Sequence, residues 1–498
     1  MRFRSFAAFG AFAIAACSEA NLPTAVSTMQ AVGGSASLAD ASGTYLVAFR
    51  GGVPADFANS VAKLGGNVMW AHDGVGLAAV EGISTSSAST LASRKDVAAF
   101  EPDMVTIIDE PTDAAVESVA AGSVESTANP AGAFFFARQW HLRAIHANEM
   151  WAAGKLGNAT TRVGILDTGI GYTHADLAGL VDLTASRSFL SAAENKRVTD
   201  TFGATTNLVA DLHYHGTHVA STVSSNALAA AGVASKVKLV GLKVCSPGFP
   251  NDTASKAFVA SCPSSAVLGA VLYASDIGLD VINMSLGGAF NRRDASARGG
   301  DSPSFLAIIN SVFNYAHKKG TAVVVSAGNS SYDIDHLGNG YVTYCDAPHV
   351  ICVAATGPTS GGSAGPWPNI DAPAYYTNFG RSGITVAAPG GSGTIALVAG
   401  KPTVVTPTFT YAACSRFTIV TGFTVCQTGT FVLGLQGTSM SAPHVTGLAA
   451  IIAGEVGHNP DAIRDRLTST ADDLGAVGTD PFYGRGRINA AHAMGVSY

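Results

Sequence analysis

From about Trp140 to the end of the chain, short apolar segments alternate with segments of helical periodicity, and this rhythm limits the available folds. Strands are predicted at residues 162–166, 237–244, 280–284, 322–325, 350–354 and 384–387, and helices at 216–225, 264–277, 303–318 and 440–454. Strands that alternate with helices are joined by right-handed crossovers into a parallel sheet. We therefore predict an α/β fold whose ligands bind beyond the carboxyl ends of the strands.

Residues 391–435 interrupt the alternation and predict a β-rich insertion. The chain has 7 cysteines, and without Cys17 six remain. They fall into three local pairs that each close a short loop, so we predict the disulfides Cys245–Cys262, Cys345–Cys352 and Cys414–Cys426. No two of the six are spaced as Cys-x-x-Cys, which argues against a zinc site. Disulfides imply an oxidising compartment and agree with export.

The first residues have the pattern of a targeting signal. Arg2 and Arg4 precede an apolar stretch at residues 6–16, which is too short for the ~20 residues that span a bilayer. We interpret residues 1–17 as a signal peptide. Ile14-Ala15-Ala16-Cys17 is similar to a bacterial lipobox, which predicts lipidation of Cys17 and a place in the cell envelope, with Ser18 favouring the outer membrane. Ordinary cleavage with an incidental Cys17, and an extracellular product, is the alternative.

Three further segments precede the α/β region. Residues 18–42 are rich in Ala, Ser and Thr and are interpreted as a tether. Residues 43–108 predict a small α+β unit with a βαββαβ-like order. Residues 109–137 are polar, acidic at their start and without periodicity, so we predict a linker that is open to proteolysis.

Three segments carry the residues of nucleophilic catalysis. Asp167 ends a strand in Gly-Ile-Leu-Asp-Thr-Gly, His215 opens the helical segment His-Gly-Thr-His-Val-Ala, and Ser439 lies in Gly-Thr-Ser-Met-Ser-Ala-Pro-His-Val. A serine hydroxyl needs an imidazole to take its proton and a carboxylate to orient that imidazole. The net charge of −6, without a basic cluster, argues against a nucleic-acid partner.

These three segments, in this order, resemble the signature blocks of the subtilisin-like serine proteases, or subtilases, over residues 138–498. The resemblance implies a subtilisin-like parallel sheet with helices on both faces. It implies a triad of Asp167, His215 and Ser439, with an oxyanion hole formed by the Asn329 side chain and the Ser439 N–H. It also implies that an extended peptide binds at Ser285, Leu286, Gly287, Ala327 and Gly328, with broad specificity.

The resemblance extends to the other parts of the chain. It implies that residues 43–108 are a ferredoxin-like propeptide that assists folding and inhibits the protease, and that a cut in residues 109–137 releases a monomeric endopeptidase. No cofactor is required for the reaction. Calcium is common in the family, and Asp176 stands where it often binds, but the loop after His215 offers only Asn226 as a partner. A calcium site and a capped turn both stay open.

Other interpretations are weighed against this one. A metallohydrolase is one alternative, because a His-x-His-x-x-His cluster is formed by His213, His215 and His218. This interpretation leaves the Ser439 segment unexplained. An α/β-hydrolase has a different order of triad residues. A binding protein on a protease scaffold would lack one of the catalytic groups, and all four candidates are present. His444 is predicted to be a hydrogen-bonded core residue.

Overall fold

The computed structural model describes residues 43–108, 111, 114–119, 129–248, 259–292, 302–398 and 401–498. All of them belong to one compact unit, Ser35–Tyr498. The predicted signal peptide, the lipobox with Cys17, and the tether over residues 18–42 lie outside the described residues. No helix within the described ranges is both long enough and apolar enough to cross a membrane.

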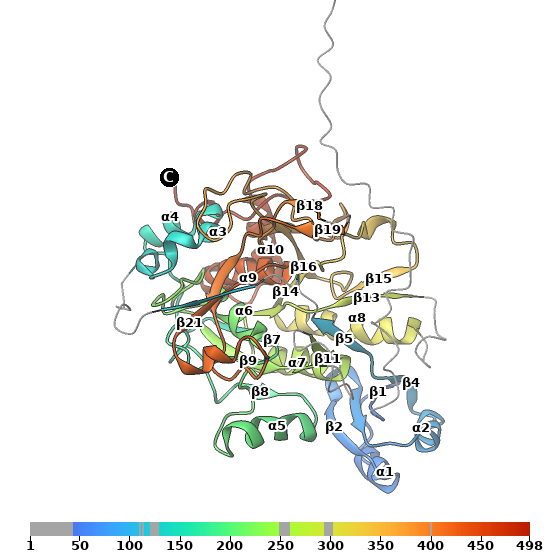
Figure 1. Ribbon diagram of the computed structural model, residues 1–498. Helices are drawn as coiled ribbons and strands as arrows, with labels where there is room; N and C mark the ends of the chain where they lie inside the picture. Colours follow the sequence, from blue (N-terminus) through green and yellow to red (C-terminus); the bar gives the residue numbers. More distant parts are fainter. Residues whose placement is uncertain are drawn as a thin grey trace, which may run out of the picture. The chain divides into compact units, whose positions relative to one another are not determined.

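A seven-stranded sheet forms the centre of the α/β region (Figure 1). Its strands, in spatial order, are β17 (Val386–Pro389), β16 (Val350–Thr356), β14 (Ala322–Ser326), β12 (Val281–Met284), β7 (Arg162–Asp167), β9 (Lys238–Lys243) and β8 (Arg187–Ser188). Every neighbouring pair runs parallel. The predicted parallel α/β fold is therefore confirmed.

Apolar residues alternate between the two faces of this sheet, and each face has its own hydrophobic core. Val163 and Ile165 belong to the core that includes residues of α6 (His215–Val223) and α9 (Thr438–Val456). Leu166 and Ile282 belong to the other core, with residues of α7 (Ser264–Asp276) and α8 (Ser302–Lys319). Because both faces are covered, the strands are almost continuously apolar, as expected of buried parallel strands.

Residues 43–102 form a separate antiparallel sheet with two helices. The elements are β1 (Tyr45–Phe49), α1 (Phe57–Lys63), β2 (Asn67–His72), β3 (Leu77–Glu81), α2 (Thr85–Ala92) and β4 (Val97–Pro102), and the sheet order is β2-β3-β1-β4. The βαββαβ order agrees with the sequence pattern. The next strand, β5 (Val105–Ile108), lies outside this sheet and pairs with β11 (Ala260–Pro263), which also pairs with β10 (Ser246–Pro247).

The description of residues 109–137 as an unstructured linker is wrong for part of the segment. Residues 115–118 form β6 (Ala115–Ser118), which pairs antiparallel with β21 (Phe431–Leu435), and Arg138 contacts Glu117 at 2.7 Å. Two short 3₁₀ helices follow at Pro130–Gly132 and Phe136–Arg138. A four-residue strand has too little alternation to be predicted, because its stability comes from a partner some 300 residues away.

The described residues of 391–435, the segment predicted to be a β-rich insertion, include four strands. The segment contains β18 (Ile395–Val398) paired with β19 (Lys401–Val404), and β20 (Thr410–Ala413) paired with β21. The three predicted disulfides, Cys245–Cys262, Cys345–Cys352 and Cys414–Cys426, are all formed. The remaining elements are α3 (Trp140–Ala144), α4 (Ala147–Ala152), α5 (Ala192–Phe202), β13 (Gly288–Asn291), β15 (Gly340–Thr343), α10 (Pro460–Ser469), α11 (Ala490–Ala493) and the 3₁₀ helices at Asp73–Val75, Ile334–His336 and Thr424–Thr428.

Candidate active site

A carboxylate and an imidazole from neighbouring elements form a buried pair. Asp167 is the last residue of β7, and His215 is the first residue of α6. His215 Nδ1 lies 2.8 Å from Asp167 Oδ1, and the same oxygen accepts the Thr168 N–H at 2.7 Å. A carboxylate on Nδ1 fixes the tautomer that leaves Nε2 able to accept a proton.

The two residues come this close because Gly216, which follows His215, has no side chain. A Cβ at Gly216 would lie 2.2 Å from the Gly169 carbonyl oxygen and 3.1 Å from Asp167 Oδ1. Any larger residue would therefore push α6 away from the end of β7.

Ser439 lies at the carboxyl end of the next strand along the sheet. Leu166 of β7 is paired in register with Met284 of β12, so Asp167 and Ser285 leave neighbouring strands at the same edge. Such strands are about 4.8 Å apart. Ser439 is the second residue of α9, its Oγ donates to the Ser285 carbonyl at 3.3 Å, and the Ser285 hydroxyl donates to the Ser439 carbonyl at 2.8 Å. These two bonds hold the start of α9 against the end of β12.

Asn329 is oriented by the residue that precedes Ser439. Its Oδ1 accepts both the Thr438 N–H and the Thr438 hydroxyl, each at 2.9 Å. The backbone N–H can only donate, so the acceptor end of the amide faces Thr438 and the Nδ2 donor points away from it. Ser439 stands in the first turn of α9, where backbone N–H groups lack intrahelical acceptors. The Ser439 N–H and Asn329 Nδ2 are therefore the two candidate donors to a developing oxyanion.

The segment after β12 pairs with a strand from the N-terminal part of the chain. Ile107 of β5 makes an antiparallel bridge with Gly287, and β5 pairs antiparallel with β11 on its other side. Leu286 is buried, and Ala327 is buried at the end of β14. Of the predicted substrate-binding residues, Gly287 thus pairs with an extended strand, while a substrate role for Ser285, Leu286, Ala327 and Gly328 stays a prediction.

The histidine cluster does not have the geometry of a metal site. His215 Nδ1 is bound to Asp167, and His218 Nε2 lies 3.1 Å from the Thr410 carbonyl, to which it must donate. His218 therefore keeps a lone pair only on Nδ1. Burial lowers the pKa of His218 to about 3. The described part of the chain contains no group of three His, Cys, Asp or Glu side chains arranged for a metal ion.

His444 is a hydrogen-bonded core residue, as predicted. Its Nδ1 lies 2.7 Å from the Met440 carbonyl and its Nε2 lies 2.7 Å from His141 Nδ1. His141 Nε2 in turn accepts the Tyr411 N–H at 3.2 Å. This chain of hydrogen bonds fixes both tautomers, because each ring donates from Nδ1 and accepts at Nε2. Both rings are therefore neutral.

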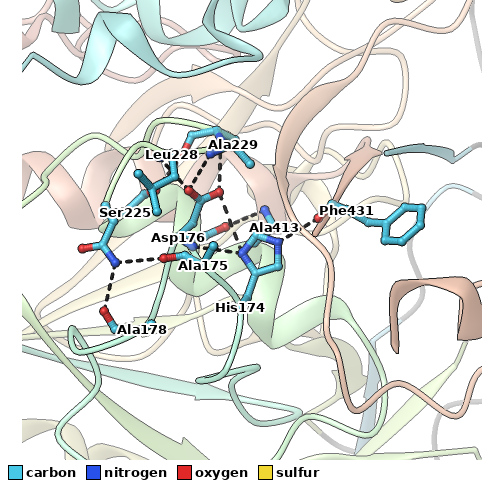
Figure 2. A network of polar contacts seen from close by, with 12 residues as sticks. His174, Ala175, Asp176, Ala178, Ser225, Leu228, Ala229, Ala413 and Phe431 are labelled. Atoms are coloured by element: carbon cyan, nitrogen blue, oxygen red, sulfur yellow. Dashed lines mark hydrogen bonds and ion pairs between the residues drawn. The ribbon is translucent and has the colours of Figure 1, made fainter. Parts of the chain in front are cut away.

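Asp176 stands where the sequence resemblance suggests calcium, but hydrogen-bond donors surround its carboxylate in this chain (Figure 2). Asp176 Oδ1 accepts the N–H groups of Leu228 and Ala229 at 2.8 Å each, and Oδ2 accepts the Ala230 N–H at 3.0 Å. Asn226 directs its amide nitrogen to the carbonyls of Ala175 and Ala178, both at 2.9 Å. Calcium requires oxygen ligands directed at one point, and here amide hydrogens occupy the carboxylate.

The neighbouring histidine agrees with this interpretation of the turn. His174 Nδ1 accepts the Asp176 N–H at 3.2 Å, and Nε2 lies 3.0 Å from the Phe431 carbonyl, to which it donates (Figure 2). His174 is therefore neutral, and burial lowers its pKa. Of the two alternatives at Asp176, the residues fit a capped turn and do not fit a cation.

Several residues that support the site were missed in the sequence. Asn283 donates to the Ser285 hydroxyl at 2.9 Å, Thr438 orients Asn329, and Asp211 lies behind the Asp167–His215 pair. Each was detectable only as a polar residue in an apolar context: Asn283 interrupts Val-Ile-Asn-Met, and Asp211 stands between Ala210 and Leu212. What these side chains contact depends on strand neighbours that are distant in sequence.

A parallel α/β sheet whose carboxyl edge brings together a carboxylate–imidazole pair, a serine at a helix N-terminus and an oriented amide defines the class of serine hydrolases. The model of the subtilase family matches residues 158–486. The chain belongs to the subtilase family and is a subtilisin-type serine protease.

Relatives agree in sequence and in fold. Subtilisin DY of Bacillus licheniformis is 30% identical over 355 residues, which cover 70% of this chain and 96% of that protein. Thermitase of Thermoactinomyces vulgaris is 28% identical over 368 residues, covering 73% of this chain and 99% of the relative. The epidermin leader peptide processing serine protease of Staphylococcus aureus superposes with a TM-score of 0.65 at 20% identity, over 92% of this chain and 100% of that chain, which is a likeness of fold.

Proposed function

We propose that the protein is an endopeptidase that cuts peptide bonds with a triad of Asp167, His215 and Ser439. The observation that carries this proposal is the buried Asp167–His215 bond of 2.8 Å at the sheet edge next to Ser439. In the reaction, the Ser439 hydroxyl turns from the Ser285 carbonyl to His215 Nε2 and attacks the scissile carbonyl as His215 takes its proton. Asn329 Nδ2 and the Ser439 N–H bind the oxyanion. His215 then protonates the leaving amine, and water hydrolyses the acyl-enzyme.

Two variants on the same helix test this proposal. Ser439→Ala should abolish hydrolysis of an unstructured protein such as casein and abolish covalent labelling by a fluorophosphonate. Ser441→Ala is the matched control, because Ser441 is equally buried two residues further along α9, and it should retain both. If a chelator removes activity while Ser439→Ala retains it, the triad assignment is wrong and the metal interpretation is right.

We also propose that residues 43–108 are a propeptide that blocks this site before maturation. β5 lies between β11 and Gly287, in the position that an extended substrate would take. An added strand gains main-chain hydrogen bonds with little demand on its side chains, which supports broad specificity once the propeptide leaves.

Side chains outside β5 support the same contact. Asp103 accepts the Ser265 N–H at 2.8 Å and the Ser265 hydroxyl, so it caps the start of α7. Trp70 Nε1 donates to the Ser265 carbonyl at 3.0 Å, and His72 pairs with Asp276 at 3.0 Å. The small unit is therefore bound to the protease by a helix cap and by an added strand.

The strand register indicates an early maturation cut. Because Ile107 is paired antiparallel with Gly287, β5 reaches Ile108 in the direction that leads from Gly287 back to Ser285, whose carbonyl accepts the Ser439 hydroxyl. We therefore propose that the processed bond lies between Ile108 and Ala115. N-terminal sequencing of the mature enzyme should give a first residue in this interval, and the full-length Ser439→Ala protein should stay intact. A first residue beyond Ser118 would contradict the register argument.

Export and anchoring are proposed from the N-terminal sequence. One relative, 31% identical over 362 residues that cover 68% of this chain and 52% of that protein, is the extracellular protease of Xanthomonas campestris. If Cys17 is lipidated, metabolic labelling with a fatty acid should mark the precursor and be lost in Cys17→Ser. Cleavage between Ile108 and Ala115 would then leave the lipid on the propeptide and release the protease.

A further inference from the structure

A second buried carboxylate lies directly behind the Asp167–His215 pair. Asp211 is 0% exposed and stands four residues before His215. Its Oδ1 accepts the Thr168 hydroxyl at 2.8 Å and the His213 N–H at 2.9 Å. Its Oδ2 accepts the Thr217 N–H at 2.9 Å and the Thr217 hydroxyl at 2.5 Å. These four bonds use the lone pairs of both oxygens.

Backbone N–H groups help to orient the two hydroxyl groups. Thr168 Oγ1 accepts the Gly216 N–H at 2.9 Å, and Thr217 Oγ1 accepts the Gly171 N–H at 2.8 Å. Each hydroxyl therefore receives a backbone hydrogen and directs its own hydrogen to Asp211. All four contacts donate to the carboxylate, which is the pattern that stabilises the ionised form.

This network joins the two chain segments that carry the catalytic pair. Thr168 follows Asp167, and Gly216 and Thr217 follow His215, so Asp211 bonds to the backbone or side chain next to both residues. A displacement of either segment would break at least two of these bonds. The distance between Asp167 Oδ1 and His215 Nδ1 is thus set by Asp211 as well as by the pair itself.

The charged and titratable groups around Asp211 come from several elements. Asp167 lies on β7, and Lys243 lies opposite it on β9, with Nζ donating to the Ala210 carbonyl at 2.7 Å. Burial lowers the pKa of Lys243 to about 8, and burial raises the pKa of Asp211, while the Thr217 and Thr168 donors act against that rise. The other ionisable groups nearby are Glu194 and Arg197 on α5, His213 and His218 beside His215, and Arg416. Arg416 follows Ser415, and the Ser415 hydroxyl donates to the Asp211 carbonyl.

We propose that Asp211 is a positioning residue for proteolysis, which holds the segments of Asp167 and His215 together and whose negative charge stabilises the imidazolium formed during the reaction. This inference rests on the proposed triad. The proposed role of Asp211 differs from a purely structural one, because a charge near His215 changes the pH at which the imidazole titrates. A neutral supporting residue would not change that pH.

The test is the pH profile of kcat/KM for Asp211→Asn. The variant removes the charge and turns an NH₂ group toward donors that need an acceptor. We expect kcat to fall about 10- to 100-fold with KM within about threefold, as for a misplaced catalytic group. The acid limb of the profile should move to lower pH by about 0.5–1 unit, because a lost negative charge lowers the pKa of His215.

Three further variants distinguish positioning from stability. Asp176→Asn is the matched control, because this carboxylate is also 0% exposed and accepts three backbone N–H groups in another network. It should lower the melting temperature without moving the acid limb. Should Asp211→Asn fail to fold, Thr168→Val removes one donor and the Gly216 link. It should lower kcat about tenfold, while Thr168→Ser restores it.

The outcomes separate this inference from the proposed function. If fluorophosphonate labels Ser439 but the acid limb of Asp211→Asn coincides with that of the parent, the inference is wrong and the triad stands. The inference is also wrong if Thr168→Val and Thr168→Ser have equal kcat. If Ser439 is not labelled in the parent enzyme, the proposed function itself fails.

Discussion

The three buried histidines whose pKa values are lowered most, His141, His218 and His444, should account for most of the acid sensitivity of this protein. His141 and His444 lie in one chain of hydrogen bonds that fixes the tautomers of both rings. His218 donates to the Thr410 carbonyl. Burial lowers the pKa of His218 to about 3 and of His444 to about 4, and lowers that of His141 well below its ordinary value. A second proton on His141 or His444 would meet an N–H that already donates to that ring nitrogen.

The sign and size of the effect follow from proton linkage. An unfolded histidine binds its proton below a pH of about 6.5, whereas these three stay neutral in the folded protein until the pH is much lower. Stability is therefore complete above pH ~6.5 and falls as the pH decreases, by about 1.4 kcal/mol per pH unit for each histidine. Three histidines give a limiting slope of about 4 kcal/mol per pH unit. Between pH 6.5 and 4.5 the loss is about 7 kcal/mol, which is comparable to the whole stability of many proteins.

Urea unfolding of the Ser439→Ala protein at pH values from 8 to 4.5 measures this slope without autolysis. His218→Gln keeps a side-chain donor for the Thr410 carbonyl but does not titrate, so it should reduce the limiting slope by about one third. His336→Gln is the control, because His336 is exposed and Asp333 raises its pKa. An unchanged slope in His218→Gln would refute the claim that burial of neutral His218 causes the acid sensitivity.

Three other changes should have separable effects. Asn329→Leu should lower kcat about 10²- to 10³-fold with little change in KM, measured on a peptide substrate, because it removes one oxyanion donor. Asp176→Asn should lower the free energy of unfolding by about 1–3 kcal/mol. Added calcium should raise the unfolding temperature of the parent protein no more than that of Asp176→Asn. A larger rise in the parent would reveal a cation at Asp176. Asp103→Ala should weaken inhibition by the separate 43–108 fragment about 10- to 100-fold, while an unchanged inhibition constant would show that the helix cap contributes nothing.

The sequence predicted those parts of the fold that depend on local pattern. Buried parallel strands such as Val163–Leu166 are apolar throughout, and the small-residue helix after Ser439 has no polar face, so both stand out over a few residues. The three disulfides were predictable because each joins cysteines that are 7 to 17 residues apart. The residues of the proposed triad stand out in the sequence because each lies in a short motif of small residues.

What the sequence could not predict depends on partners that are distant along the chain. β6 is a strand only because β21 pairs with it, and β2 and β4 are strands only because β3 and β1 lie beside them. Asp176 matched a position of the family, but its real partners are three backbone amides of a turn that begins 50 residues later. The identity of a side chain does not indicate whether a neighbouring loop presents carbonyl oxygens or amide hydrogens to it.

The same arrangement recurs at the three aspartates that are fully buried within the described part of the α/β region. Asp167, Asp176 and Asp211 are each 0% exposed, and each carboxylate accepts at least one backbone N–H from a loop that it holds in place. A backbone amide is a fixed donor that does not titrate and loses no side-chain entropy when it binds a buried carboxylate. It therefore holds the carboxylate in a better-defined geometry than a flexible lysine or arginine would. Because such bonds are buried, added salt should screen them little. The geometry of the catalytic pair should therefore persist in a low-charge protein whose surface ion pairs contribute little to stability.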